Sequence, residues 1–152
     1  MAKLKYSHTN LVASDWKKIA KFYVDVFDCI PVGPVRRLSG QSVAEGTGLN
    51  EPEIEGIHLR LPGFEEEGPT LEIFQYRKVH EEPEKLANSR GFTHIAFEVF
   101  DLEIVCAKVI SAGGSLLGKL AKQSVDGVGM CTFVYVRDPD RNIIGVQQWE
   151  AL

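Results

Sequence analysis

Apolar and polar residues alternate along two short stretches of the chain, and each stretch carries a histidine. The stretches are Tyr6–Val12, which contains His8, and Phe92–Val99, which contains His94. Alternation at every second residue is the period of a β-strand whose two faces differ. We therefore predict two strands with the two histidines at matching positions, which indicates an internal repeat in the chain.

An amphipathic helix is predicted directly after each of these strands. Ser14 or Asp15 is expected to cap the first helix, over about residues 16–27, and Asp101 opens the second, over about residues 102–112. Apolar residues recur in both segments at helical spacing: Trp16, Ile19, Ala20, Tyr23, Val26 and Phe27 in the first, Leu102, Val105, Cys106, Val109 and Ile110 in the second.

The remaining segments complete the same order in both halves. In the first half we predict a weak edge strand over 29–35, a long loop over 39–53, and strands over 57–61 and 70–76. Residues 77–90 are polar, contain a proline and are predicted to be a linker. In the second half a strand is expected within 115–124, followed by strands over 130–137 and 142–149.

The order strand–helix–strand–strand–strand thus occurs twice. The prediction is an α+β fold, a single domain over residues 1–152 with one module at about 4–76 and another at about 91–150. Neither four-stranded module closes its own sheet, so pairing of the two would cover exposed edges.

Charge and composition exclude several classes of partner. The formal net charge is -4, whereas nucleic-acid binding favours clustered lysine and arginine. No apolar stretch approaches the length of a membrane span, and the first residues lack the apolar core of a signal peptide. The cysteines, Cys29, Cys106 and Cys131, are dispersed and include no C-x-x-C pair. We therefore expect a cytoplasmic protein that binds neither nucleic acid nor membrane.

Three residues are candidates for metal ligation. A single histidine on a half-buried strand is more often structural, but His8 and His94 occupy the same place in a repeat. Glu72 lies between apolar neighbours and shares a strand face with Phe74 and Tyr76, and a buried carboxylate needs a partner. Two imidazoles and one carboxylate are a suitable donor set for Zn, Ni, Fe, Co or Mn.

The chain resembles the vicinal oxygen chelate superfamily, which includes glyoxalase I, methylmalonyl-CoA epimerase, the extradiol dioxygenases and the bleomycin resistance proteins. The resemblance covers nearly the whole chain and is carried by Ser7-His-Thr-Asn-Leu11, Lys21-Phe-Tyr23, Pro69-Thr-Leu-Glu-Ile-Phe-Gln75, Phe92-Thr-His-Ile-Ala-Phe97 and Asp138-Pro-Asp-Arg-Asn-Ile-Ile144. It implies two βαβββ modules that form a cup-shaped mixed sheet, and metal ligands at His8, Glu72 and His94. It also implies a homodimer.

One position departs from the family pattern. Where four-ligand members of the family have a glutamate near the end of the chain, this sequence has Gly145. Glycine has no side chain and cannot bind a metal ion, so three protein ligands are expected. Gln147 lies two residues further on the same strand face. Asn10, Arg60 and Tyr135 are further pocket candidates, for which surface or structural roles are favoured.

The resemblance favours a metal-dependent enzyme of the glyoxalase or epimerase type, acting on a small molecule beside a carbonyl group. In such enzymes a metal ion holds vicinal oxygens and stabilises an enediolate or enolate, while a base moves the neighbouring proton. With Gly145 at the family's glutamate position, Glu72 would act as both base and ligand, or a metal-bound hydroxide would act as the base. The alternatives are an extradiol-type dioxygenase and a binding or resistance protein without catalysis.

Overall fold

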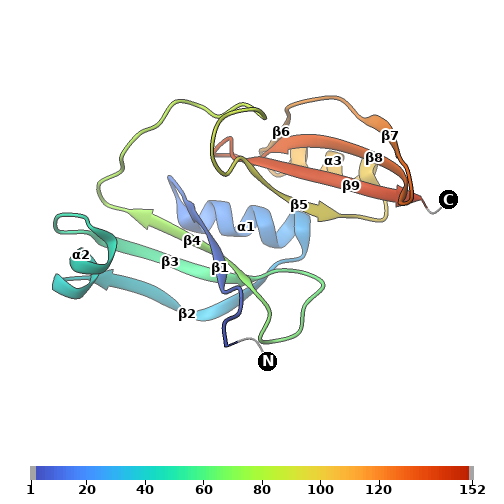
Figure 1. The fold of residues 1–152 in the computed structure, drawn as a ribbon. Helices are drawn as coiled ribbons and strands as arrows, with labels where there is room; N and C mark the ends of the chain where they lie inside the picture. Colours follow the sequence, from blue (N-terminus) through green and yellow to red (C-terminus); the bar gives the residue numbers. More distant parts are fainter. Residues whose placement is uncertain (1–2, 151–152) are drawn as a thin grey trace. The chain divides into compact units, whose positions relative to one another are not determined.

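The structure, a computed structural model, describes residues 3–150, and the chain divides into two compact units, residues 1–81 and 82–152. The elements of the first unit are β1 (His8–Val12), α1 (Trp16–Phe27), β2 (Ile30–Ser39), α2 (Gln41–Thr47), β3 (Glu53–Arg60) and β4 (Thr70–Tyr76). Those of the second are β5 (His94–Glu98), α3 (Leu102–Ser111), β6 (Ser115–Leu116), β7 (Ala121–Val125), β8 (Gly129–Arg137) and β9 (Ile143–Glu150) (Figure 1).

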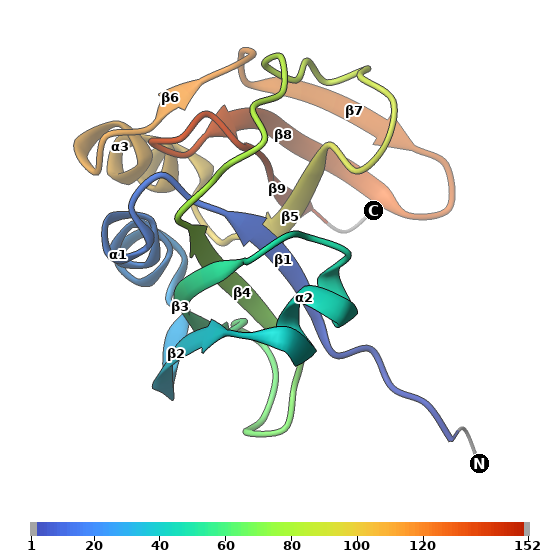
Figure 2. The ribbon, with the colours of Figure 1, turned by 90° about the vertical axis from the view of Figure 1, so that its left-hand side faces the viewer.

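The first unit is a four-stranded sheet with the order β1-β4-β3-β2, in which β1 runs parallel to β4 and the other pairs are antiparallel. Helix α1 packs against β3 and β4 (Figure 2). The side chains that are most deeply buried in this unit form its core: Ile19, Phe22, Tyr23, Leu59, Leu71 and Ile73. Strand β2 is at the edge of the sheet, as its prolines predict.

The second unit repeats this plan with the order β5-β9-β8-β6, and β7 also pairs with β8. Strand β5 runs parallel to β9, and α3 packs against β8 and β9. Its most buried apolar side chains are aliphatic: Val109, Val134, Val136, Ile144 and Val146. The α+β class and the duplicated module predicted from the sequence are confirmed.

The two long helices begin in the same way. Asp15 Oδ1 accepts hydrogen bonds from the main-chain N–H groups of the first turn of α1, and Asp101 Oδ1 does so at α3. In addition, Gln75 Oε1 accepts from the first N–H of α1 at 3.0 Å, and Gln148 Oε1 accepts from the first N–H of α3 at 2.9 Å. Both glutamines come from the last strand of their unit. Within residues 3–150, no helix has the length and apolar character to cross a membrane.

Two segments differ from the sequence prediction. The predicted loop over 39–53 contains the seven-residue helix α2, whose N-cap, Gly40, makes no side-chain capping bond; a short helix that contains a glycine gives little periodic signal. The single strand expected within 115–124 is two strands, because Leu117 and Gly118 both donate their N–H to the Tyr135 carbonyl and the chain then leaves the sheet.

Gly56 allows strands β3 and β4 to pair closely. It lies opposite Phe74 in the antiparallel register. A Cβ atom there would lie 2.0 Å from the main-chain oxygen of Ile73 and 2.7 Å from the Phe74 ring. Backbone cannot give way at that separation, so any larger residue would force the two strands apart.

We predict that Gly56→Ala lowers the free energy of unfolding by about 2 kcal/mol or more, because the added methyl group meets main-chain atoms. Gly46→Ala in α2 is the matched control, since a Cβ there meets nothing within 4 Å, and we expect it to be neutral or slightly stabilising. Urea denaturation followed by circular dichroism measures both. Equal stability of the two variants would contradict the packing described here.

Candidate metal centre

Glu72 is a buried carboxylate at the middle of β4, with only 9% of the residue exposed. Its neighbours Leu71 and Ile73 point into the core beneath α1, so strand alternation directs Glu72 to the opposite face of the sheet. The pairing register places Asn10 of β1 on one side of it and His58 of β3 on the other. Cross-strand partners share a face, so both side chains can reach the carboxylate.

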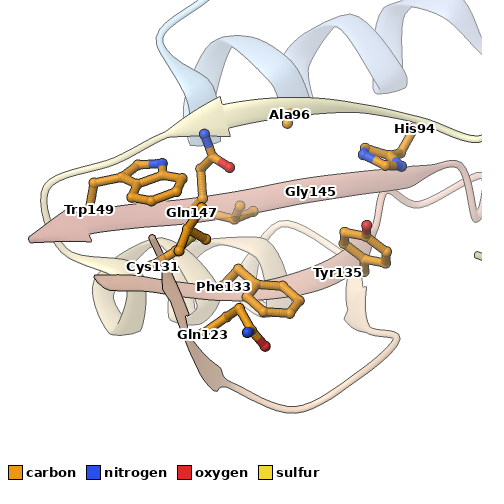
Figure 3. Close-up of a pocket in the computed structure, with 11 residues that line it drawn as sticks. His94, Ala96, Gln123, Cys131, Phe133, Tyr135, Gly145, Gln147 and Trp149 are labelled. Atoms are coloured by element: carbon orange, nitrogen blue, oxygen red, sulfur yellow. The ribbon is translucent and has the colours of Figure 1, made fainter. Parts of the chain in front are cut away.

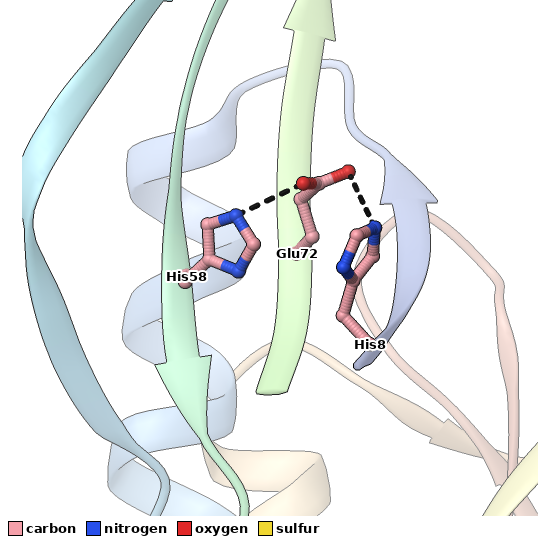
Figure 4. A group of neighbouring side chains, drawn as sticks. All are labelled: His8, His58 and Glu72. Carbon is pink, nitrogen blue, oxygen red and sulfur yellow. Dashed lines mark ion pairs between the residues drawn. The ribbon is translucent and has the colours of Figure 1, made fainter. Parts of the chain in front are cut away.

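Each oxygen of the carboxylate has an imidazole partner. His8 Nε2 lies 3.4 Å from Glu72 Oε1, and His58 Nε2 lies 2.9 Å from Glu72 Oε2 (Figure 4). Asn10 Nδ2 donates a further hydrogen bond of 2.9 Å to Oε1. The two rings are 5.3 Å apart between centroids and nearly perpendicular. Three strands therefore bring one carboxylate and two imidazoles together.

Two hydroxyl groups hold the other nitrogen of each ring. His58 Nδ1 lies 2.7 Å from Thr70 Oγ1, and His8 Nδ1 lies 3.0 Å from Ser7 Oγ. When each hydroxyl oxygen accepts a hydrogen bond from Nδ1–H, the lone pair of Nε2 is directed at Glu72. An outer partner on one ring nitrogen is the usual way in which a protein orients a metal-binding histidine.

The surroundings of His58 favour its neutral form. Burial lowers the pKa of this imidazole, and the charge of Glu72, the next largest influence, opposes the effect. Arg36 and His8 both add to the lowering. A neutral imidazole is the form that binds metal ions.

The three groups fit a divalent metal ion. One ligand atom from each of His8, His58 and Glu72 lies within 4.8 Å of the other two. Atoms bound to one ion at 2.0–2.2 Å are at most about 4.4 Å apart, so the three groups lie near the separation that a shared ion requires. His58 Nε2–H can donate a hydrogen bond to Glu72 Oε2, and when the proton is on Nδ1 instead, both atoms present lone pairs that a cation can accept.

His94, the third ligand predicted from the sequence, lies in the second unit. It opens β5 as His8 opens β1. Its ring lies against Tyr135, with the centroids 4.7 Å apart, and its Nδ1 is 3.4 Å from Thr93 Oγ1. Gly145 is adjacent, because a Cβ there would be 3.3 Å from His94 Cδ2. The first unit thus supplies His8 and Glu72 together with His58, and His94 remains a predicted ligand.

The strand registers relate the two histidine environments position by position. Asn10 pairs with Glu72, which pairs with His58. In the second unit Ala96 pairs with Gly145, which pairs with Tyr135. Gly145 therefore occupies the place of Glu72, in agreement with the missing glutamate inferred from the sequence. The polar set of the first unit is replaced by alanine, glycine and tyrosine in the second.

The missing side chain leaves a cavity of about 230 Å³ on the sheet of the second unit (Figure 3). His94 and Tyr135 lie at one end and Trp149 at the other, with Phe133 between them. Besides His94 and Tyr135, two amide side chains line it: Gln147, a pocket candidate from the sequence, and Gln123 of β7. An aromatic wall with a few amide groups suits an uncharged or planar organic molecule.

Sequence reasoning missed His58. The residue lies in a strand that was predicted, but its role depends on the register that sets it opposite Glu72. The signal that could have found it is the pairing of two polar residues, His58 and Glu72, across neighbouring strands. Of the other pocket candidates, Asn10 contacts Glu72, and Tyr135 lines the cavity of the second unit. Arg60 is half-buried on the site face of β3 and lines a separate hollow with Phe64 and the following acidic turn.

Comparison with known proteins identifies relatives of this fold. The family model described as the Glyoxalase/Bleomycin resistance protein/Dioxygenase superfamily matches residues 5–146. A solved glyoxalase family protein from Bacillus cereus is 17% identical, with a TM-score of 0.81 and 98% of each chain covered. A glyoxalase/bleomycin resistance protein/dioxygenase family enzyme from Burkholderia phytofirmans is 14% identical, with a TM-score of 0.60 and coverage of 95% of this chain and 98% of its own. At these identities the likenesses show the fold alone. No curated protein matches the chain.

We predict that none of the three cysteines reacts as a nucleophile in the folded protein. All are free and buried, and burial raises the pKa of the Cys29 thiol to about 12 and those of Cys106 and Cys131 above the usual value. A raised pKa keeps the unreactive thiol form up to alkaline pH. Ellman's reagent at pH 8 should therefore label no cysteine until denaturant is added. Rapid labelling of the folded protein would contradict the burial described here.

Proposed function

The chain belongs to the Glyoxalase/Bleomycin resistance protein/Dioxygenase superfamily, and we propose that it is a metal-dependent enzyme acting on a small molecule. The observation that supports this most is the carboxylate of Glu72 between two imidazoles, at 3.4 Å and 2.9 Å. In this proposal His8, His58 and Glu72 hold a divalent ion such as Zn, Ni, Co, Fe or Mn. His94 is proposed as a further ligand from the second unit.

The proposed reaction is proton transfer at the carbon beside a carbonyl group, as in lyases and isomerases of the glyoxalase and epimerase type. A divalent ion in such a site polarises the carbonyl oxygen and favours loss of the neighbouring proton. Glu72 is the carboxylate at the centre of the set, so we assign the proton transfer to it. Asn10 holds Oε1 by a hydrogen bond, and this contact fixes the direction in which the carboxylate points.

An extradiol-type dioxygenase is the second candidate, because two histidines and one carboxylate are also the donor set of non-haem Fe(II) oxygenases. The first unit offers that set by itself in His8, His58 and Glu72. A non-catalytic binding or resistance protein is the third candidate. The cavity beside Gly145 favours it, since that cavity is lined by aromatic and amide side chains and by no carboxylate.

We further propose a cytoplasmic homodimer. All three cysteines are free, as is usual for a reducing compartment. Phe92 and Phe100, which flank the edge strand β5, are fully exposed at 101% and 102%, and large exposed apolar side chains often mark a contact with another chain.

The metal centre predicts the metal content of four variants. We expect about one divalent ion per chain in the reconstituted wild type, and loss of most of it in His8→Ala, His58→Ala and Glu72→Gln, because each removes one of three ligands. His80→Ala is the matched control, since His80 is the one histidine not assigned to a site. Elemental mass spectrometry of tag-free protein measures all of them.

The same measurement decides the role of His94. Loss of metal in His94→Ala would establish it as a ligand, whereas full occupancy would restrict the centre to the first unit. A wild type that takes up no metal after reconstitution, or a His58→Ala and Glu72→Gln pair that retains it, would refute the proposed centre and favour the binding protein.

The assignment of Glu72 predicts metal-dependent hydrogen exchange beside a carbonyl group. We expect the metal-loaded protein to exchange the α-hydrogens of hydroxyacetone in D₂O, as followed by ¹H NMR. Glu72→Gln should slow exchange by about a hundredfold or more, because it removes both the base and a metal ligand. Oxygen consumption with catechol in the Fe(II) or Mn(II) protein, without any hydrogen exchange, would overturn this assignment in favour of the dioxygenase.

A further inference from the structure

A second hollow of the first unit adjoins the candidate metal centre. It has a volume of about 210 Å³, and His58 forms part of its wall. Ser7 and Thr70 line it as well, and these are the residues whose hydroxyls hold Nδ1 of His8 and His58. The hollow therefore lies on the Nδ1 side of the histidines, and Glu72 is not among its lining residues.

Two cationic side chains and one carboxylate line this hollow. The cations are Arg36 of β2 and Lys5, which precedes β1, and the carboxylate is the exposed Glu67. Arg36 lies opposite Gly56, two residues before His58 on β3, so its side chain shares the face of the metal centre. Glycine at that position leaves the arginine without a facing side chain.

Arg36 differs from Arg37 and Arg77 of the same unit. Arg37 pairs with Glu55 at 3.2 Å, and Arg77 pairs with Glu53 at 2.8 Å. Arg36 is half-buried, and its guanidinium donates to the main-chain oxygen of Pro34. Among residues 3–150 it forms no ion pair with a carboxylate. A half-buried guanidinium without an acidic partner retains several donors for a bound anion.

We propose that Arg36, assisted by Lys5, binds an oxyanion group of the substrate, a carboxylate or a phosphate, next to the metal centre. The substrate of the proposed enzyme would then be a small anion with its carbonyl group at the metal centre. This inference rests on the proposed function. A planar guanidinium binds both kinds of oxyanion through two parallel hydrogen bonds. The volume of the hollow is below that of pockets for drug-sized ligands, and it suits one such group.

The test measures anion binding to the metal-free protein. Inorganic phosphate and acetate are titrated separately, and binding is followed through the main-chain ¹H–¹⁵N NMR signals of residues 32, 33, 35–37 and 58. We expect Arg36→Gln to weaken the binding of the preferred anion by about tenfold or more, because charge-assisted hydrogen bonds are lost. Lys5→Gln should have a smaller effect. Tighter binding of phosphate or of acetate identifies the group.

Arg37→Gln is the matched control, since Arg37 is the next residue, pairs with Glu55 and does not line the hollow. We expect it to bind both anions as the wild type does. Unfolding midpoints of the two arginine variants show that both are folded. Equal anion affinity in Arg36→Gln and Arg37→Gln, or no binding of either anion to the wild type, would overturn the anion site.

The metal content of the same variants separates the two proposals. Arg36→Gln should retain the divalent ion, because Arg36 is not a ligand. A wild type that binds phosphate through Arg36 but takes up no metal would refute the metal-dependent enzyme and support the anion site. A wild type that takes up metal but binds neither anion would refute the anion site alone.

Discussion

The buried carboxylate of Glu72 is the constraint on which the candidate site depends. A carboxylate removed from water needs partners, and Glu72 obtains them from both neighbouring strands through the pairing of β4 with β1 and β3. A register slip of one residue on β3 would turn His58 into the core and expose an aliphatic residue at the site. The close fit at Gly56 lies two residues from His58 and belongs to the same strand pairing that joins His58 to Glu72.

The duplicated module shows how one backbone can carry two chemistries. The strand pairing, the helix caps and the capping glutamines correspond in the two units. At three corresponding positions, however, the first unit has Asn10, Glu72 and His58, and the second has Ala96, Gly145 and Tyr135. The first set is polar and can surround a cation, whereas the second leaves space beside aromatic rings. The sheet supplies the positions, and the side chains decide between a charged and an apolar site.

Periodicity predicted the features that depend on one segment at a time. Helix α1 and strand β4 have the predicted bounds, since a strong apolar stripe and a clear alternation determine them. Glu72 was recognised because a charge between apolar neighbours is conspicuous. His58 was not recognised, because its role depends on the pairing of β3 with β4, and the sequence of a single strand does not show that pairing. The helix α2 was missed because the glycines at its two ends and at position 46 are also typical of a loop.

The two sides of His58 suggest how a substrate would be oriented. Its Nε2 faces the carboxylate of Glu72, and its Nδ1 faces Thr70, which lines the hollow with Arg36. The imidazole therefore lies between the proposed metal centre and the cations of the hollow. The charged end of an anionic substrate would be held by Arg36 in the hollow. Its reacting carbon would then extend past His58 toward Glu72, where proton transfer is proposed.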